Sequence, residues 1–153
     1  MRVVLQRVKK TSVKVQEKTV GEIPYGFLVL LGVAQEDSSE DVLWLVDKIL
    51  KLRLFGGGDN GSFLEKNIKE VGGSILVVSQ FTLFGDCRKG TRPSFGEAAE
   101  PDKAKELYNL FVEKLKEKGV QVETGIFGAE MEVELVNNGP VTLVIDSKNA
   151  KIR

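Results

Sequence analysis

The stretch at residues 79–95 concentrates side chains that can bind a ligand or take part in a reaction. It begins where an apolar run ends, with Ser79, Gln80 and Thr82 close together, and continues into a loop rich in hydroxyl and basic side chains. Where a strand ends, backbone N–H groups lose their ladder partners and become available to a ligand. Such donors can hold a substrate carbonyl or a developing oxyanion. The stretch therefore predicts a site built mainly from hydrogen-bond donors.

A second polar stretch, Asn137-Asn138-Gly139-Pro140-Val141-Thr142, lies between two predicted strands near the C-terminus. Taken alone, an Asn-Gly pair is typical of an ordinary hairpin turn. Glycine has no Cβ and also lets a backbone approach a ligand closely. We expect this second stretch to meet residues 79–95.

The missing residue types narrow the possible chemistry. The chain has no histidine and a single cysteine, Cys87. Ser-His and Cys-His nucleophile pairs, imidazole acid–base chemistry and His-ligated metal sites are therefore excluded. Arg88 and Lys89 are the kind of neighbours that activate a thiol, but without a histidine we interpret Cys87 as an incidental loop cysteine.

Two other arrangements of polar residues are weaker candidates. Asp59, Glu65 and Asp86 could hold a hard cation, but solvated surface acids are the better interpretation. The glycine-rich run at 56–61 lacks the Lys-Ser/Thr ending of a P-loop, which argues against phosphate binding there. We predict no metal and no cofactor.

The totals describe an ordinary globular chain. A length of 153 residues predicts one domain over residues 1–153. The net charge is zero, so a polyanionic partner must be met by a local basic patch. The lone cysteine indicates a reducing compartment. Neither a signal peptide nor a membrane-spanning run is present in the sequence, and we expect a cytoplasmic protein without membrane contact.

Apolar periodicity predicts the elements that must position these residues. The predicted strands are 3–8, 12–16, 20–23, 27–33, 74–80, 120–123, 131–136 and 141–145. One helix begins after Ser38, a good N-cap, and a second begins near Pro101 and ends before Gly119. Because the strands are grouped, we expect an α+β fold. Its mainly antiparallel sheet would curl into a barrel-like structure, with the two main helices packed on it.

The two polar stretches carry a resemblance to a known family. Ser79-Gln80-Phe81-Thr82-Leu83, followed by residues 137–142, resembles the two signature motifs of the D-aminoacyl-tRNA deacylase family. Similar segments extend over most of the chain, at 3–8, 26–32, 92–95 and 107–108. One departure is the segment at 62–68, where the family usually carries a Met-Asn-Leu-type run.

The resemblance implies a cytoplasmic homodimeric enzyme with a barrel-like fold and no cofactor. Its substrate would be aminoacyl-tRNA, and it would hydrolyse the ester between a D-amino acid and the 3′ end of the tRNA. It would also clear glycine from mischarged tRNA. The resemblance further implies that Gly139-Pro140 is a cis peptide inserted into the active site of the partner subunit, where it rejects L-amino acids.

Residues 79–82 would then be catalytic. We expect the Phe81 and Thr82 amides to hold the substrate carbonyl or oxyanion, beside Ser79, and Gln80 to fix the terminal adenosine or a water molecule. Thr82 could alternatively be a nucleophile, but no general base is available to take its proton. It could also be a structural strand threonine.

Several basic and aromatic residues could contact the tRNA. Arg88, Lys89 and Arg92 could clamp phosphates near the acceptor end, unless they simply form a solvated face. Three cations near the C-terminus could add to them: Lys148, Lys151 and Arg153. Three phenylalanines could stack on the terminal adenine, with at least one of them in the core instead: Phe81, Phe84 and Phe95.

Two functions of other classes remain open from the residues. The first is a non-catalytic tRNA- or nucleotide-binding module, and the second is a purely structural dimerisation domain. The presence of both polar stretches disfavours the structural domain. A charging assay with D- and L-aminoacyl-tRNA separates a binder, which leaves the ester intact, from the enzyme.

Overall fold

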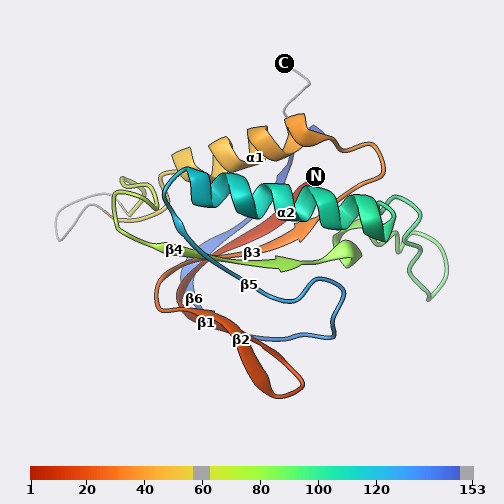
Figure 1. The fold of residues 1–153 in the computed structure, drawn as a ribbon, viewed down its shortest axis with the longest axis horizontal. Helices are drawn as coiled ribbons and strands as arrows, with labels where there is room; N and C mark the ends of the chain where they lie inside the picture. Colours follow the sequence, from red (N-terminus) through yellow and green to blue (C-terminus); the bar gives the residue numbers. More distant parts are fainter. Residues whose placement is uncertain (57–62, 149–153) are drawn as a thin grey trace.

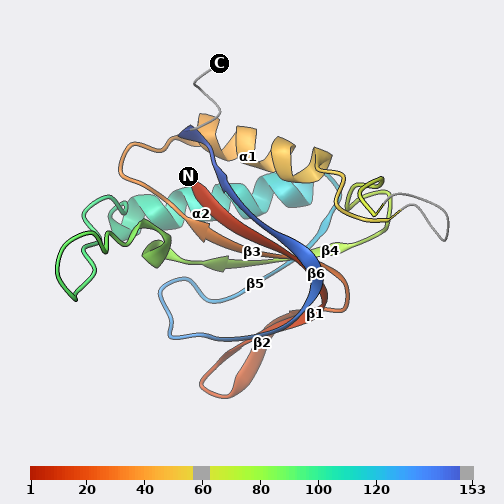
Figure 2. The same ribbon diagram turned by 180° about the vertical axis from the view of Figure 1, so that it is seen from behind.

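The computed structural model describes residues 1–56 and 63–148, and it has an α+β architecture. A mixed sheet curls until it is nearly closed into a barrel, and two helices lie side by side on one of its faces (Figures 1 and 2). The elements are β1 (Arg2–Val15), β2 (Lys18–Ile23), β3 (Gly26–Gly32), α1 (Ser39–Lys51), β4 (Ser74–Ser79), the 3-10 turn η1 (Phe81–Phe84), α2 (Pro101–Glu117), β5 (Gln121–Thr124) and β6 (Glu132–Asp146).

The sheet is organised around the long strand β1. Its first half pairs with β3 and its second half with β2, while β6 pairs along most of its other edge, all antiparallel. The pairs β3–β4 and β4–β5 are parallel, because α1 and α2 each carry the chain back across the sheet. Among the described residues, three pairs are antiparallel and two parallel, so the expected mainly antiparallel sheet is confirmed with a parallel portion added.

The separate strands predicted at 131–136 and 141–145 are in fact one strand, β6. Asn137 pairs with Val8 and Thr142 pairs with Gln6, so residues 138–141 bulge out opposite Arg7. The Asn137 Nδ2 group donates to the carbonyls of Arg7 at 2.9 Å and Val141 at 3.1 Å. These bonds close the bulge, and the strand resumes instead of turning back. The segments predicted at 3–8 and 12–16 are likewise one strand, β1.

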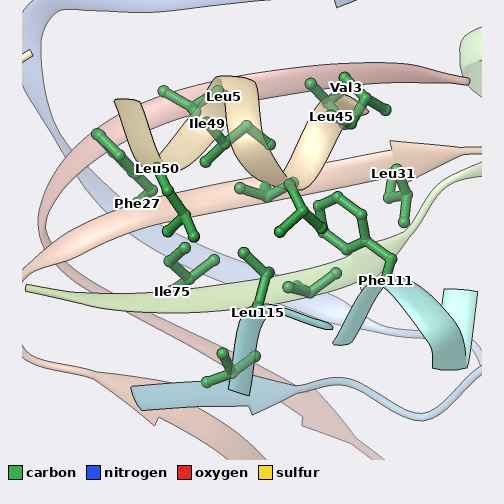
Figure 3. Close-up of a cluster of buried hydrophobic side chains, with 14 of the residues drawn as sticks. Val3, Leu5, Phe27, Leu31, Leu45, Ile49, Leu50, Ile75, Phe111 and Leu115 are labelled. Atoms are coloured by element: carbon green, nitrogen blue, oxygen red, sulfur yellow. The ribbon is translucent and has the colours of Figure 1, made fainter. Parts of the chain in front are cut away.

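Two apolar clusters explain why the central strands read as continuous apolar runs. Phe27, Leu31 and Ile75 face the helices and pack with α1 and α2 residues such as Ile49 and Phe111 (Figure 3). The intervening side chains of β3 and β4 point to the other face, into the barrel: Leu28, Leu76 and Val78. Because both faces of these strands are covered, their sequence loses the apolar–polar alternation of a half-exposed strand.

The helix ends follow the predicted signals. At the start of α1, the Ser38 N–H donates to the Asp41 carboxylate at 2.9 Å. Pro101 occupies the first turn of α2, and Gly119 follows that helix with φ +81°, a conformation that glycine adopts readily. Within the described residues, neither helix is long and apolar enough to cross a membrane.

Candidate active site

A cavity of about 470 Å³ opens at the carboxyl ends of β3 and β4. Its wall combines strand ends, the first half of α2 and the loop before β6. The lining residues are Leu31, Val33, Val78, Ser79, Gln80, Phe81, Ala99, Pro101, Ala104, Tyr108, Phe127, Gly128, Ala129, Met131 and Val133. The wall is mostly apolar with a few polar groups at one end, which is typical of a small-molecule site.

The cavity exists because β4 continues beyond its neighbour β5. The β4–β5 pairing ends at Val77 and Thr124, so the last residues of β4 have no β5 partner. The Val77 carbonyl instead accepts hydrogen bonds from the Tyr108 hydroxyl at 2.9 Å and from the Gly125 N–H at 3.2 Å. Burial raises the pKa of Tyr108 to about 12. Tyr108 thus anchors α2 to β4, the strand that leads into residues 79–82.

Residues 79–81 line this cavity, and Thr82 follows them directly in the chain. The Gln80 N–H donates to the Leu31 carbonyl at 2.8 Å, and the chain then turns into η1. Ser79 and Gln80 are half-buried, whereas Phe81 and Thr82 are exposed. The Gln80 Nε2 group donates to the Thr82 hydroxyl.

At the start of η1, the backbone N–H groups of Phe81 and Thr82 donate to no other residue in the described part of the chain. The Leu83 N–H donates to Gln80 at 3.3 Å, which is the first bond of the turn. The N–H groups of Phe81 and Thr82 precede it, and the first donors of a helical turn have no partner inside it. Adjacent backbone donors of this kind can bind an oxyanion.

Gly32 lets η1 pack against the end of β3. A Cβ at this position would lie 3.0 Å from the Gln80 carbonyl oxygen and 3.0 Å from the Phe84 ring. No side chain fits there without moving the turn. The absence of a side chain at Gly32 therefore allows residues 80–84 to lie close to the end of β3.

The three phenylalanines have different surroundings. Phe84 is buried at 7% exposure, which confirms that one of them is core. Phe81 and Phe95 are 58% and 37% exposed, and their rings meet edge to face with centroids 5.0 Å apart. This exposed pair stands beside the open donors of η1.

The basic loop after η1 lies outside the cavity wall. Arg88 is exposed and binds Asp86 through Nε at 2.8 Å and Nη2 at 2.7 Å. This hydrogen bonding lowers the pKa of Asp86 to about 2. Lys89 and Arg92 are exposed and form no ion pair with any described residue. Cys87 is also exposed, between Asp86 and Arg88.

Among the remaining polar candidates, those that the structure describes do not gather into a site. Lys148 pairs with Glu36 at 2.6 Å, and Lys151, Arg153 and Asp59 lie outside the described residues. Glu65 is exposed. In the described part of the chain, no three His, Cys, Asp or Glu side chains are grouped as metal ligands would be.

Gly139 and Pro140 lie on the exposed bulge of β6, and the peptide bond between them is cis, as expected. The buried Arg7 side chain holds the bulge, because Nε donates to the Asn138 carbonyl at 3.2 Å and Nη2 reaches the Gly139 carbonyl at 3.5 Å. Its Nη1 group donates to the Leu54 carbonyl. The lining of the cavity includes no residue from 137–142, so the two polar stretches do not meet within one chain.

Sequence reasoning missed the two side chains that support the polar stretches. Tyr108 entered the sequence analysis only within the family-like segment 107–108, although its hydroxyl holds β4. Arg7 follows Val3 and Leu5 at an inward position of β1 and is only 7% exposed. An arginine in the buried phase of an alternating strand was the available signal, because such a charge needs several hydrogen-bond partners.

Comparisons with known proteins find relatives along nearly the whole chain. The family model described as D-Tyr-tRNA(Tyr) deacylase matches residues 4–146. A D-aminoacyl-tRNA deacylase of Thermotoga petrophila is 56% identical over 147 residues, which covers 96% of this chain and 97% of that protein. A D-aminoacyl-tRNA deacylase of Clostridioides difficile is 53% identical over 150 residues, covering 98% and 99% of the two chains.

Solved structures share the fold. A c-Myc DNA unwinding element binding protein has a TM-score of 0.89 at 37% identity, covering 95% of this chain and 98% of its own. A probable eukaryotic D-amino acid tRNA deacylase has a TM-score of 0.81 at 19% identity, covering 94% and 97%, and this likeness shows the fold alone. The family model and the relatives span nearly the whole chain, and the chain therefore belongs to the D-aminoacyl-tRNA deacylase family of hydrolases.

Proposed function

We propose that this protein hydrolyses the ester that joins a D-amino acid to the 3′ end of tRNA, with residues 79–82 as its catalytic stretch. The observation that carries the assignment is the start of η1, where the N–H groups of Phe81 and Thr82 donate to no described residue and Phe81 lines the apolar cavity. Membership of the deacylase family supports the same reaction.

The chemistry suits a protein without histidine. An aminoacyl ester is a labile bond, and its α-ammonium group already activates the carbonyl. The protein then needs to position the ester and a water molecule and to stabilise the oxyanion. The Phe81 and Thr82 amides supply the stabilisation, and Gln80, fixed through its backbone to Leu31, orients the adenosine or the water.

Water, and not Thr82, is the nucleophile in this proposal. The Thr82 hydroxyl is hydrogen-bonded to the Gln80 carboxamide. A carboxamide is not a base in either orientation, so this partner does not activate the hydroxyl. Thr82 therefore positions Gln80 and the substrate.

The tRNA end is proposed to enter past the exposed aromatic pair. Phe81 and Phe95 can stack on an unpaired base. Lys89 and Arg92 are exposed cations close by in sequence that can meet the phosphates. Arg88 is the weaker candidate of the three, because Asp86 already engages its guanidinium.

The active form is proposed to be a homodimer in which each site is completed by the partner. β6 is a fifteen-residue strand whose outer edge carries no strand among the described residues. It exposes three large apolar side chains, Leu135, Val136 and Val144. A long apolar edge of this kind tends to pair with another chain, and pairing would bring the Gly139-Pro140 bulge toward a second copy.

Gly139-Pro140 is proposed to select the chirality of the substrate. D and L substrates carry the same groups, so only a rigid element close to the α-carbon can separate them. Arg7 and Asn137 hold the bulge firmly. In the proposed arrangement the D side chain points to solvent and an L side chain collides with the dipeptide. Glycine offers no side chain to reject, so glycyl-tRNA is a substrate too.

The protein is proposed to act in the cytoplasm as one domain, without a metal or another cofactor. Deacylation is expected to continue in a strong chelator. Loss of activity with EDTA that a divalent ion restores would contradict the metal-free mechanism.

A charging assay tests the function. The protein is incubated with D- and L-aminoacyl-tRNA, and the charged fraction is followed over time. We expect the D ester and glycyl-tRNA to be hydrolysed and the L ester to survive. Protection of the D ester would indicate a non-catalytic tRNA-binding module. An active monomer in sedimentation at assay concentration would contradict the shared site.

A further inference from the structure

Arg2 holds the end of η1 opposite to its open donors. Its Nη1 group donates to the Leu83 carbonyl at 2.8 Å, and its guanidinium lies over the Phe84 ring at 4.8 Å. Leu83 and Phe84 are the last two residues of the turn. Arg2 therefore contacts η1 through both a hydrogen bond and a ring.

Asp146 fixes the guanidinium in this position. The Arg2 Nε and Nη2 groups donate to Asp146 Oδ2 at 3.0 and 2.9 Å. The Asp146 side chain is 14% exposed, so solvent screens the pair less than it screens an exposed one. A guanidinium that is bound on two sides has a defined orientation, which a single exposed contact would not give.

The strand register places this clamp beside the site. Arg2 pairs with Gly32 on one side and with Asp146 on the other. Gly32 is the residue whose missing side chain makes room for η1. The turn η1 thus packs against Gly32, and the neighbouring Arg2 binds its C-terminal end at Leu83.

We propose that Arg2 is a positioning residue for the catalytic turn, and that it acts by fixing η1 through Leu83 and Phe84. This inference rests on the proposed role of the Phe81 and Thr82 amides. A 3-10 turn rises about 2.0 Å per residue, so the clamped end and the open donors are only about 4 Å apart. A change in the orientation of Leu83 therefore moves the N–H groups of Phe81 and Thr82. A displacement of a catalytic group by about 1 Å can lower the rate by about 10²-fold.

The charge of Arg2 has a competing use. Arg2 borders the surface hollow that Asp86, Cys87 and Arg88 line, and its side chain is 35% exposed. If it contacted tRNA phosphate instead, its loss would raise KM and reduce the salt dependence of KM. If it positions η1, its loss lowers kcat and leaves KM in place.

Steady-state kinetics of Arg2→Met on D-aminoacyl-tRNA tests the proposal. We expect kcat to fall by about 10- to 100-fold, with KM changed less than about twofold. Arg2→Lys keeps one donor for Leu83 and should recover part of kcat. Asp146→Asn keeps Arg2 but weakens the ion pair that orients it. We expect its kcat to lie between those of the wild type and Arg2→Met.

Lys14→Met is the matched control. Lys14 also joins β1 to β6, through Glu134 at 3.3 Å, and its side chain is 32% exposed, but it lies at the other end of the strands. We expect its kcat to match that of the wild type. Sedimentation of every variant checks that all share one oligomeric state.

Hydrogen exchange separates this inference from the proposed function, because it needs no activity. The Leu83 and Gly85 amides should exchange faster in Arg2→Met than in Lys14→Met. An unchanged kcat, a raised KM at constant kcat, or unchanged exchange in η1 would each overturn the role. If Arg2→Met fails to fold, Arg2→Lys and Asp146→Asn decide by the same criteria.

Discussion

The two polar stretches of this chain are held in opposite ways. The turn at 79–85 is packed against its own chain, with Gly32 behind it and Phe84 buried beneath it. The bulge at 138–141 stands on the surface, and its support comes from underneath, through Arg7. A segment that forms the wall of a site is held rigid by packing against its own chain. A segment that contacts a second protein must be rigid as well, but it must also stay exposed. This difference allows each region to be tested separately.

Removing Arg7 should have the largest effect, because it takes the support from the exposed bulge. Arg7→Met leaves the buried Leu54 carbonyl and the Asn138 carbonyl without their donor. We expect a loss of about 2–4 kcal/mol in unfolding free energy, and deacylation reduced at least about 10²-fold. Urea unfolding and the charging assay measure both. Arg53→Met, at a side chain 61% exposed, is the control and should change neither.

Adding one methyl group to each region should separate activity from stability. At Gly139 a Cβ would meet nothing nearer than the Asn137 side-chain oxygen at 4.0 Å. Gly139→Ala should therefore keep its unfolding free energy within about 0.5 kcal/mol, yet lose about 10²-fold in deacylation. Gly32→Ala should lose stability and activity together. Full activity in Gly139→Ala would contradict the entry of the bulge into a partner's site.

Removing the Thr82 hydroxyl should change the activity of the packed turn less than the substitutions above. Thr82→Ala keeps the backbone donor and loses only the contact with Gln80. We expect a loss below about 10²-fold in kcat, whereas removing a true nucleophile can cost about 10⁴-fold or more. Thr82→Ser should be close to wild type. An acyl-enzyme trapped on Thr82 in mass spectrometry would show that the water mechanism is wrong.

The smallest effect should be the alkaline titration of Tyr108, which anchors the packed region. Its pKa is raised to about 12 in the folded protein, whereas a free tyrosine titrates near about 10. The Tyr108 hydroxyl therefore stays protonated to a higher pH in the folded state than in the unfolded state. This stabilisation is complete below pH of about 10 and is lost as the pH rises toward about 12. Tyr108→Phe should flatten the decline in unfolding free energy over that interval, and an unchanged slope would contradict it.

The sequence by itself determined both helices and the central strands, and it singled out the two polar stretches. Capping residues such as Ser38 and Gly119 fixed the helix ends, because those signals act within one turn. The apolar runs at 27–33 and 74–80 predicted the strands that the structure shows as β3 and β4. The two polar stretches were recognisable because their residues are adjacent in the chain.

Only the tertiary structure decided how those stretches are supported. The Asn-Gly-Pro segment reads as a turn, yet Arg7, 131 residues from Asn138, makes it a bulge inside one strand. The clamp of Arg2 on Leu83 spans 81 residues, and the Tyr108 anchor on Val77 spans 31. Local patterns reveal which residues can hydrogen-bond, but a contact between distant residues depends on the strand register and helix packing of the whole chain.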